Sequence, residues 1–183
     1  MTDPFDPLCD RLLGVEGGYV NDPKDPGGET IWGVTAAVAR AEGYAGPMAS
    51  MTRDQAKAIY RSRYWHKPGF DRIAALSSAI AAELFDTGVN MGPPEPSAWL
   101  QRALNVLNEG GRDFPDLKPD GQVGSVTVAA LAAFLVKRGP LGEKVILAIL
   151  NGFQAVRYVQ IAEARPASER FEFGWIANRV VGP

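Results

Sequence analysis

The sequence predicts a mainly helical α+β fold with one small β-hairpin, at residues 19–35. The chain has 183 residues, 46% of them hydrophobic and 22% charged, which is enough to bury one substantial core without a stapling disulfide. Apolar residues recur at three- and four-residue spacing along most of the chain, which is typical of amphipathic helices. Residues 19–35 (YVNDPKDPGGETIWGVT) instead combine turn residues with a short β-prone run, which is typical of a hairpin.

The first helix is predicted to begin after Asp3, which is placed to cap it, and to end at Gly17 and Gly18. Its apolar residues share one face: Phe5, Leu8, Cys9, Leu12 and Leu13. This boundary puts Glu16 in or near the last turn, where the helix dipole disfavours a negative charge.

The rest of the chain is predicted to be helices joined by turns. A capping box, Thr52-Arg-Asp-Gln55, opens one of them, and residues 77–90 are apolar on most sides, as in a buried central helix. The run Pro93-Pro94-Glu95-Pro96 is the strongest boundary signal, and it divides the chain into residues 1–92 and 93–183, packed on a shared core. Residues 108–124 are predicted to be a loop. The other predicted helices are 35–42, one through residues 99–107, 125–138, 142–164 and 168–179.

Several kinds of chemistry are excluded by composition. The single Cys9 and single His66 rule out an internal disulfide and the usual zinc sites, so we expect no metal and no cofactor. No dense basic stripe indicates nucleic-acid binding, and the longest apolar run, Val128–Val136, is too short to span a bilayer. The acidic N-terminus lacks the pattern of a signal peptide, so we expect synthesis in the cytoplasm. We also expect a monomer.

Carboxylates therefore remain as the main catalytic candidates. Glu16 has apolar neighbours, an acidic surrounding sequence and a predicted helix end, all of which would raise its pKa and suit it to donate a proton. Asp25 follows nine residues later in the turn-rich segment, and two carboxylates across a cleft are what glycosidic hydrolysis requires. From spacing alone the alternative stays open that Glu16 is an exposed helix-end residue and Asp25 a turn former.

A longer stretch of the sequence resembles the motif of a known protein family. The segment Glu16-Gly-Gly-Tyr-Val-Asn-Asp-Pro-x-Asp-Pro-Gly-Gly-Glu-Thr-x-x-Gly-Val-Thr35 resembles the signature of glycoside hydrolase family 108, the lysozyme-like muramidases of phages and Gram-negative bacteria. Phe85-Asp-Thr-Gly-Val-Asn-Met-Gly92 is also similar to that family. Three later motifs resemble its C-terminal peptidoglycan-binding segment: Leu100-Gln-x-Ala-Leu-Asn105, Asp120-Gly-x-Val-Gly-x-x-Thr127 and Phe173-Gly-Trp-x-x-x-Arg-Val180.

The resemblance implies a lysozyme-like catalytic region at 1–92 and a peptidoglycan-binding-type region at 93–183. It further implies an N-acetylmuramidase that cleaves the β-1,4 bond between N-acetylmuramic acid and N-acetylglucosamine in the periplasm or cell wall, after export by a holin or by secretion machinery. Glu16 would be the catalytic acid and Asp25 its partner. Thr30 would position water, although its spacing is one residue shorter than in phage lysozymes.

Four further residues are candidates for the sugar cleft, each with a structural alternative: Tyr19, Asn21, Glu29 and Asn90. Tyr19 could equally belong to the core and Asn21 could cap a loop, whereas Asn90 is expected to be buried after the central helix. Gln101 and Asp120 are expected to be surface or turn residues.

Other functions remain to be compared with the muramidase. A lytic transglycosylase needs only the acid, and a non-catalytic protein that binds cell wall or assists secretion would keep the fold without hydrolysis. A cysteine amidase would need Cys9 and His66, but Asp6 and Asp10 beside Cys9 should raise its thiol pKa. Cys9 is therefore interpreted as a core residue.

Overall fold

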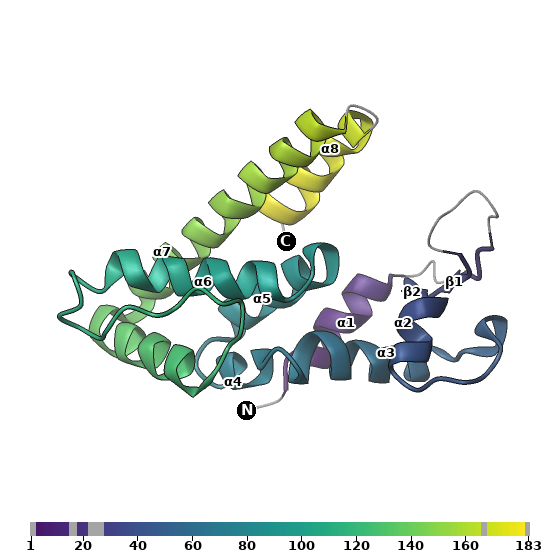
Figure 1. The fold of residues 1–183 in the computed structure, drawn as a ribbon, viewed down its shortest axis with the longest axis horizontal. Coiled ribbons are helices and arrows are strands. Elements are labelled where there is room, and N and C mark those ends of the chain that lie inside the picture. The colour runs from purple at the N-terminus through teal and green to yellow at the C-terminus, as the bar shows by residue number, and fades with distance from the viewer. Residues whose placement is uncertain (1–2, 15–17, 22–27, 166–167, 182–183) are drawn as a thin grey trace.

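The computed structural model describes residues 3–14, 18–21, 28–165 and 168–181, and within them the fold is mainly helical with one two-stranded antiparallel sheet (Figure 1). The predicted fold class is confirmed. The elements are α1 (Phe5–Leu13), β1 (Thr30–Ile31), β2 (Val34–Thr35), α2 (Ala36–Ala41), η1 (Met48–Ser50), α3 (Arg53–Tyr60), η2 (Arg61–His66), α4 (Phe70–Ala74), α5 (Ser78–Met91), α6 (Pro94–Leu107), α7 (Ser125–Ala164), α8 (Glu169–Ile176) and η4 (Ala177–Val181).

Local side-chain caps explain where several helices begin. Asp3 accepts a hydrogen bond from the Phe5 N–H at 3.1 Å, ahead of α1. Thr35 and Ser77 cap α2 and α5 in the same way, because each side chain accepts from the backbone three residues later. Thr52 opens α3 with the predicted capping box. These starts are set by residues next to each other in the sequence, which is why the sequence predicted them.

Three aromatic rings join the first helix to the centre of the molecule. Phe5 of α1 lies 5.8 Å from Trp65 of η2 and 5.6 Å from Phe85 of α5, measured between ring centroids. The same hydrophobic core continues past Pro93, through Leu100 of α6 and Leu131 of α7, both fully buried. A single contiguous core therefore contains residues from both halves of the chain.

The long helix α7 is two helical segments joined at a kink. Gly139 has a positive φ of 57° and is followed by Pro140, which lacks the N–H that a continuous helix needs. By length and composition α7 is the one described helix that could cross a membrane, with a mean hydropathy of 1.4 over 18 residues. Its inner side packs in the core through residues such as Phe134 and Ile146, as core helices of globular proteins do.

Gln101 is a core residue, which corrects the expectation that it lies at the surface. Its side chain is 2% exposed, and its Nε2 donates to Asp120 Oδ1 at 2.9 Å and to the Gln122 carbonyl at 3.0 Å. Its Oε1 accepts from the Gly121 N–H at 3.1 Å. One buried amide on α6 thus fixes the end of the 108–124 loop, because a buried amide is stable only with its hydrogen bonds made.

Candidate active site

The two predicted catalytic carboxylates, Glu16 and Asp25, lie outside the described residues, so the structure defines the segments that flank them. The helix that precedes Glu16 ends at Leu13, not at Gly17 as predicted. Gly14 ends it, with a φ of 56° that favours glycine and an N–H bonded to the Asp10 and Arg11 carbonyls. The last turn of α1 therefore finishes three residues before Glu16.

A backbone bridge closes the segment that contains Asp25. Val20 and Thr30 exchange two backbone hydrogen bonds, each 2.8 Å long, as an antiparallel pair. Thr30 then continues into β1, which pairs with β2 so that Ile31 lies opposite Val34. The hairpin predicted for residues 19–35 is present, and it holds the two ends of segment 21–29 together.

The hairpin turn is tied to the helices behind it. Trp32 and Gly33 form a two-residue turn in which both have positive φ, 53° and 71°. The Trp32 indole N–H donates to the Met51 carbonyl at 2.9 Å, and the Tyr60 hydroxyl donates to the Trp32 carbonyl at 3.4 Å. A side chain at Gly33 would meet the Tyr60 hydroxyl at 2.7 Å, so only glycine fits this approach.

Four of the predicted site residues lie at the Val20–Thr30 bridge. Thr30 is half-buried, and its hydroxyl is 3.5 Å from the Gly28 carbonyl. Tyr19 and Asn21 flank Val20 and are exposed, so the core alternative for Tyr19 is wrong. Glu29 is half-buried next to Thr30. The structure therefore brings these four residues to one end of the molecule.

Asn90 does not have the burial that the sequence suggested. It lies inside α5 instead of after it, is exposed, and donates from Nδ2 to the Asp86 carbonyl at 2.7 Å. Thr87 and Gly88 on the same helix are buried, and a residue two positions after Gly88 points to a different side because each helical residue turns about 100°. The expectation of a buried Asn90 is corrected.

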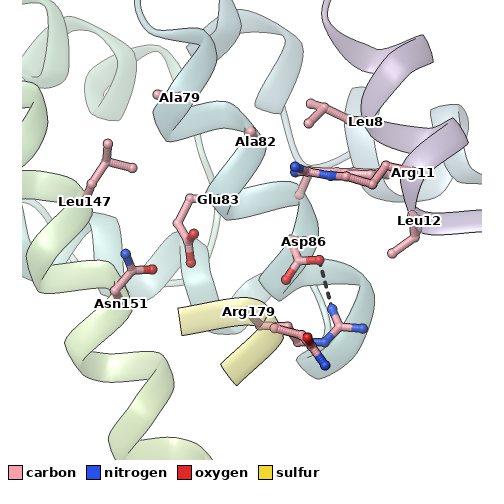
Figure 2. A pocket seen from close by; sticks show the side chains of 12 residues that line it. Leu8, Arg11, Leu12, Ala79, Ala82, Glu83, Asp86, Leu147, Asn151 and Arg179 are labelled. Atoms are coloured by element: carbon pink, nitrogen blue, oxygen red, sulfur yellow. Dashed lines mark hydrogen bonds and ion pairs between the residues drawn. The ribbon is translucent and has the colours of Figure 1, made fainter. Parts of the chain in front are cut away.

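A pocket of about 500 Å³ opens between α1, α5, α7 and η4, and we call it the α1–α5 pocket (Figure 2). Its charged side chains are Arg11 from α1, Glu83 and Asp86 from α5, and Arg179 from η4. Arg179 Nη1 lies 2.8 Å from Asp86 Oδ1. The remaining wall is mostly apolar: Leu8, Leu12, Ala79, Ala82, Phe85 and Leu147, with Asn151 and Asn178 at its edge.

Comparison with known protein families gives two adjoining matches. Residues 9–92 match the model of the family described as glycosyl hydrolase 108. This part of the chain is therefore similar to the glycosyl hydrolase 108 family. Residues 95–180 match the model described as a predicted peptidoglycan domain, so the resemblance seen in the sequence is confirmed for both parts.

The chain is also similar to a solved structure described as Brucella abortus SagA. The two share 26% sequence identity with a TM-score of 0.67, over 97% of this chain and 89% of that one. No curated protein sequence matches significantly. The glycosyl hydrolase 108 match and the peptidoglycan-domain match together support a peptidoglycan hydrolase that acts on the cell wall.

The α1–α5 pocket lies between these two domains, and the sequence analysis did not select its residues. α1 and α5 come from the glycosyl hydrolase 108 domain, whereas α7 and η4 come from the peptidoglycan domain. The sequence does contain features that point to this pocket. Asp86 and Arg179 both lie within the quoted motifs, and Glu83 and Asp86 are the only acids in the apolar segment 77–90.

Glu83 is the most perturbed carboxyl group among the described residues. Burial raises the pKa of Glu83 to about 7, and the nearby Asp86 charge acts in the same direction. The Thr87 hydroxyl, 3.2 Å away, opposes part of this rise by hydrogen bonding. With its amide nitrogen turned toward Glu83, Asn151 also donates hydrogen bonds to Glu83, at 3.1 Å to Oε2 and 3.3 Å to Oε1. Glu83 is therefore a polar group of the pocket that loses its charge just below neutral pH.

We predict that Glu83 makes the stability of the protein pH-dependent. Between its ordinary pKa of 4.5 and about 7, the folded state holds a proton that the unfolded chain releases. This contribution of Glu83 to the free energy of unfolding is therefore fully present below pH 4.5 and is lost as the pH rises through 7. The loss is about 3 kcal/mol at most. Glu83→Gln keeps the shape and stays neutral. Urea unfolding at pH 5 and pH 8 should show the variant gaining stability relative to the native protein at the higher pH.

The matched control for this prediction is Glu163→Gln, because Glu163 is exposed on α7. Its unfolding free energy should follow that of the native protein at both pH values. If Glu83→Gln and the native protein keep a constant difference between pH 5 and pH 8, Glu83 does not titrate in this range.

Cys9 is a core residue, as interpreted from the sequence. Its side chain is fully buried, and burial raises the pKa of its thiol to about 11, with smaller contributions from Asp10 and Asp6. A thiol with this pKa is protonated at neutral pH and is a poor nucleophile. His66 is exposed and pairs with Asp71 at 2.9 Å. Within the described ranges, no three His, Cys, Asp or Glu side chains are grouped to hold a metal ion.

Proposed function

We propose that this glycosyl hydrolase is an N-acetylmuramidase that cleaves the β-1,4 bond between N-acetylmuramic acid and N-acetylglucosamine. The observation that carries the proposal is the Val20–Thr30 bridge, which follows the end of α1 by only a few residues. This bridge adjoins, in the sequence, the segments that contain Glu16 and Asp25, and we propose these two carboxylates as the pair that glycosidic hydrolysis requires.

In the sequence, Glu16 stands four residues before Val20, and Asp25 stands five residues from both Val20 and Thr30. Both carboxylates therefore belong to the short sequence segments that adjoin the bridge.

In the proposed mechanism Glu16 donates a proton to the oxygen of the leaving sugar. As the bond breaks, positive charge develops on the muramic acid ring, and Asp25 either stabilises it or activates the attacking water. The Thr30 hydroxyl lies on the bridge and would orient that water. Tyr19, Asn21 and Glu29, at the same end, would contact the glycan.

Mass spectrometry of the fragments released from purified peptidoglycan tests the bond and the reaction. We expect fragments that end in a reducing muramic acid. Fragments with an anhydro-muramic end would show a lytic transglycosylase, and free peptides without glycan cleavage would show an amidase. Intact strands that remain bound to the protein would show a binding protein without hydrolytic activity.

A pair of aspartate variants tests which carboxylate assists Glu16. Asp25→Ala should lower the rate of muramic-end release by at least about tenfold, because it removes the second carboxylate of the reaction. Asp22→Ala is the matched control from the same segment and should keep near-native activity. If Asp22→Ala loses activity and Asp25→Ala keeps it, the partner has been assigned to the wrong aspartate.

A further inference from the structure

The α1–α5 pocket has the features of a ligand site of its own. Its volume of about 500 Å³ lies within the usual range for sites that hold small molecules. Half of its lining residues are apolar and half are charged or amide residues, so it offers both apolar contact and polar groups that can orient a ligand. It is built from both domains, so a ligand held there would contact each of them.

The pocket has arginines on two of its walls. Figure 2 shows Arg11 extending from α1 toward α5, while Arg179 comes from η4 and is held by Asp86. Asp86 pairs with Arg179 at 2.8 Å, whereas among the described lining residues no acid forms an ion pair with Arg11. Guanidinium groups bind carboxylates through paired N–H donors, so the pocket favours an anionic group of that kind.

Groups that can bind amides lie on the α5 and α7 walls of the pocket. Asn151 offers a carbonyl and an amide group, and a protonated Glu83 offers a donor as well as an acceptor. The apolar part of the lining includes short and branched aliphatic side chains such as Ala79, Ala82 and Leu147. A ligand with methyl groups, amides and a carboxylate would match this lining.

We propose that the α1–α5 pocket binds the peptide attached to muramic acid, with a peptide carboxylate paired with Arg11. This inference rests on the proposed action on muramic acid, since that sugar carries the peptide in peptidoglycan. A bare sugar suits the pocket less well, because sugars commonly stack on exposed aromatic faces, and the one aromatic lining residue, Phe85, is 2% exposed. The peptidoglycan domain would thereby contribute to substrate recognition through α7 and η4.

Binding of two purified ligands to the full chain tests the proposal: the N-acetylglucosamine–N-acetylmuramic acid disaccharide with its peptide, and the same disaccharide without it. We expect the peptide-bearing ligand to bind at least about tenfold more tightly by calorimetry. Arg11→Met should remove this difference, whereas Arg11→Lys, which keeps the charge, should retain part of it. Arg11 is exposed on α1, so these variants should fold, as circular dichroism would verify.

Arg165→Met is the matched control, since Arg165 is exposed at the end of α7 and does not line the pocket. It should retain the full preference for the peptide-bearing ligand. Equal affinities for the two ligands in the native protein, or a preference that survives Arg11→Met, would overturn the proposal. Product analysis of the native protein decides the muramidase assignment separately: peptide-dependent binding without muramic-end products would reject only that assignment.

Discussion

Replacing Glu16 with glutamine is expected to lower peptidoglycan cleavage at least about 100-fold while the protein remains folded. Glutamine keeps the size and shape of the side chain but has no acidic proton to give to the leaving oxygen. General acid catalysis is commonly worth two to four orders of magnitude in rate, so its loss should exceed the effect of any surface change. The measurement is the rate of release of reducing muramic ends from purified peptidoglycan.

Glu163→Gln provides the same chemical change at an exposed position of α7 and should cleave at the native rate. Thermal unfolding of both variants would show that any loss at Glu16 is catalytic and not structural. Near-native cleavage by a folded Glu16→Gln protein would refute the assignment of Glu16 as the acid.

A chain that ends at Gly92 is expected to lose its cooperative thermal transition and to aggregate. The central helix α5 depends on α7, because Thr87 accepts a hydrogen bond from Gln154 at 2.8 Å and Ser77 donates to Glu143 at 2.6 Å. Leu84 of α5 is fully buried in the core that α6 and α7 complete. Each large apolar side chain exposed costs about 1.5–3 kcal/mol, and a few would exceed the usual total stability of about 5–15 kcal/mol.

Differential scanning calorimetry of the shortened and full chains checks this expectation. The full chain should unfold in a sharp transition, and the shortened chain should show none at the same concentration. A shortened chain that folds cooperatively and cleaves peptidoglycan would establish that residues 93–183 form a separable domain.

The features that were predicted correctly from the sequence depend on neighbouring residues. The caps at Asp3 and Thr52 each satisfy backbone donors two or three residues away, so their geometry is contained in a short stretch of chain. The position of the hairpin is local for the same reason, since its turn residues and β-prone run are contiguous. The end of α1 was misjudged by a few residues because Gly14 and Gly17 are both adequate helix stops.

The sequence by itself thus determined the mainly helical class, the hairpin, and the carboxylate motif with its family resemblance. Only the tertiary structure decided the burial of Gln101, the exposure of Asn90 and the pKa of Glu83. Each of these depends on which side of a helix meets a segment distant in sequence, as when α7 covers Glu83 on α5. A side chain is buried, and its pKa shifts, where packing of distant segments removes it from water. The spacing of residues along the sequence does not contain this information.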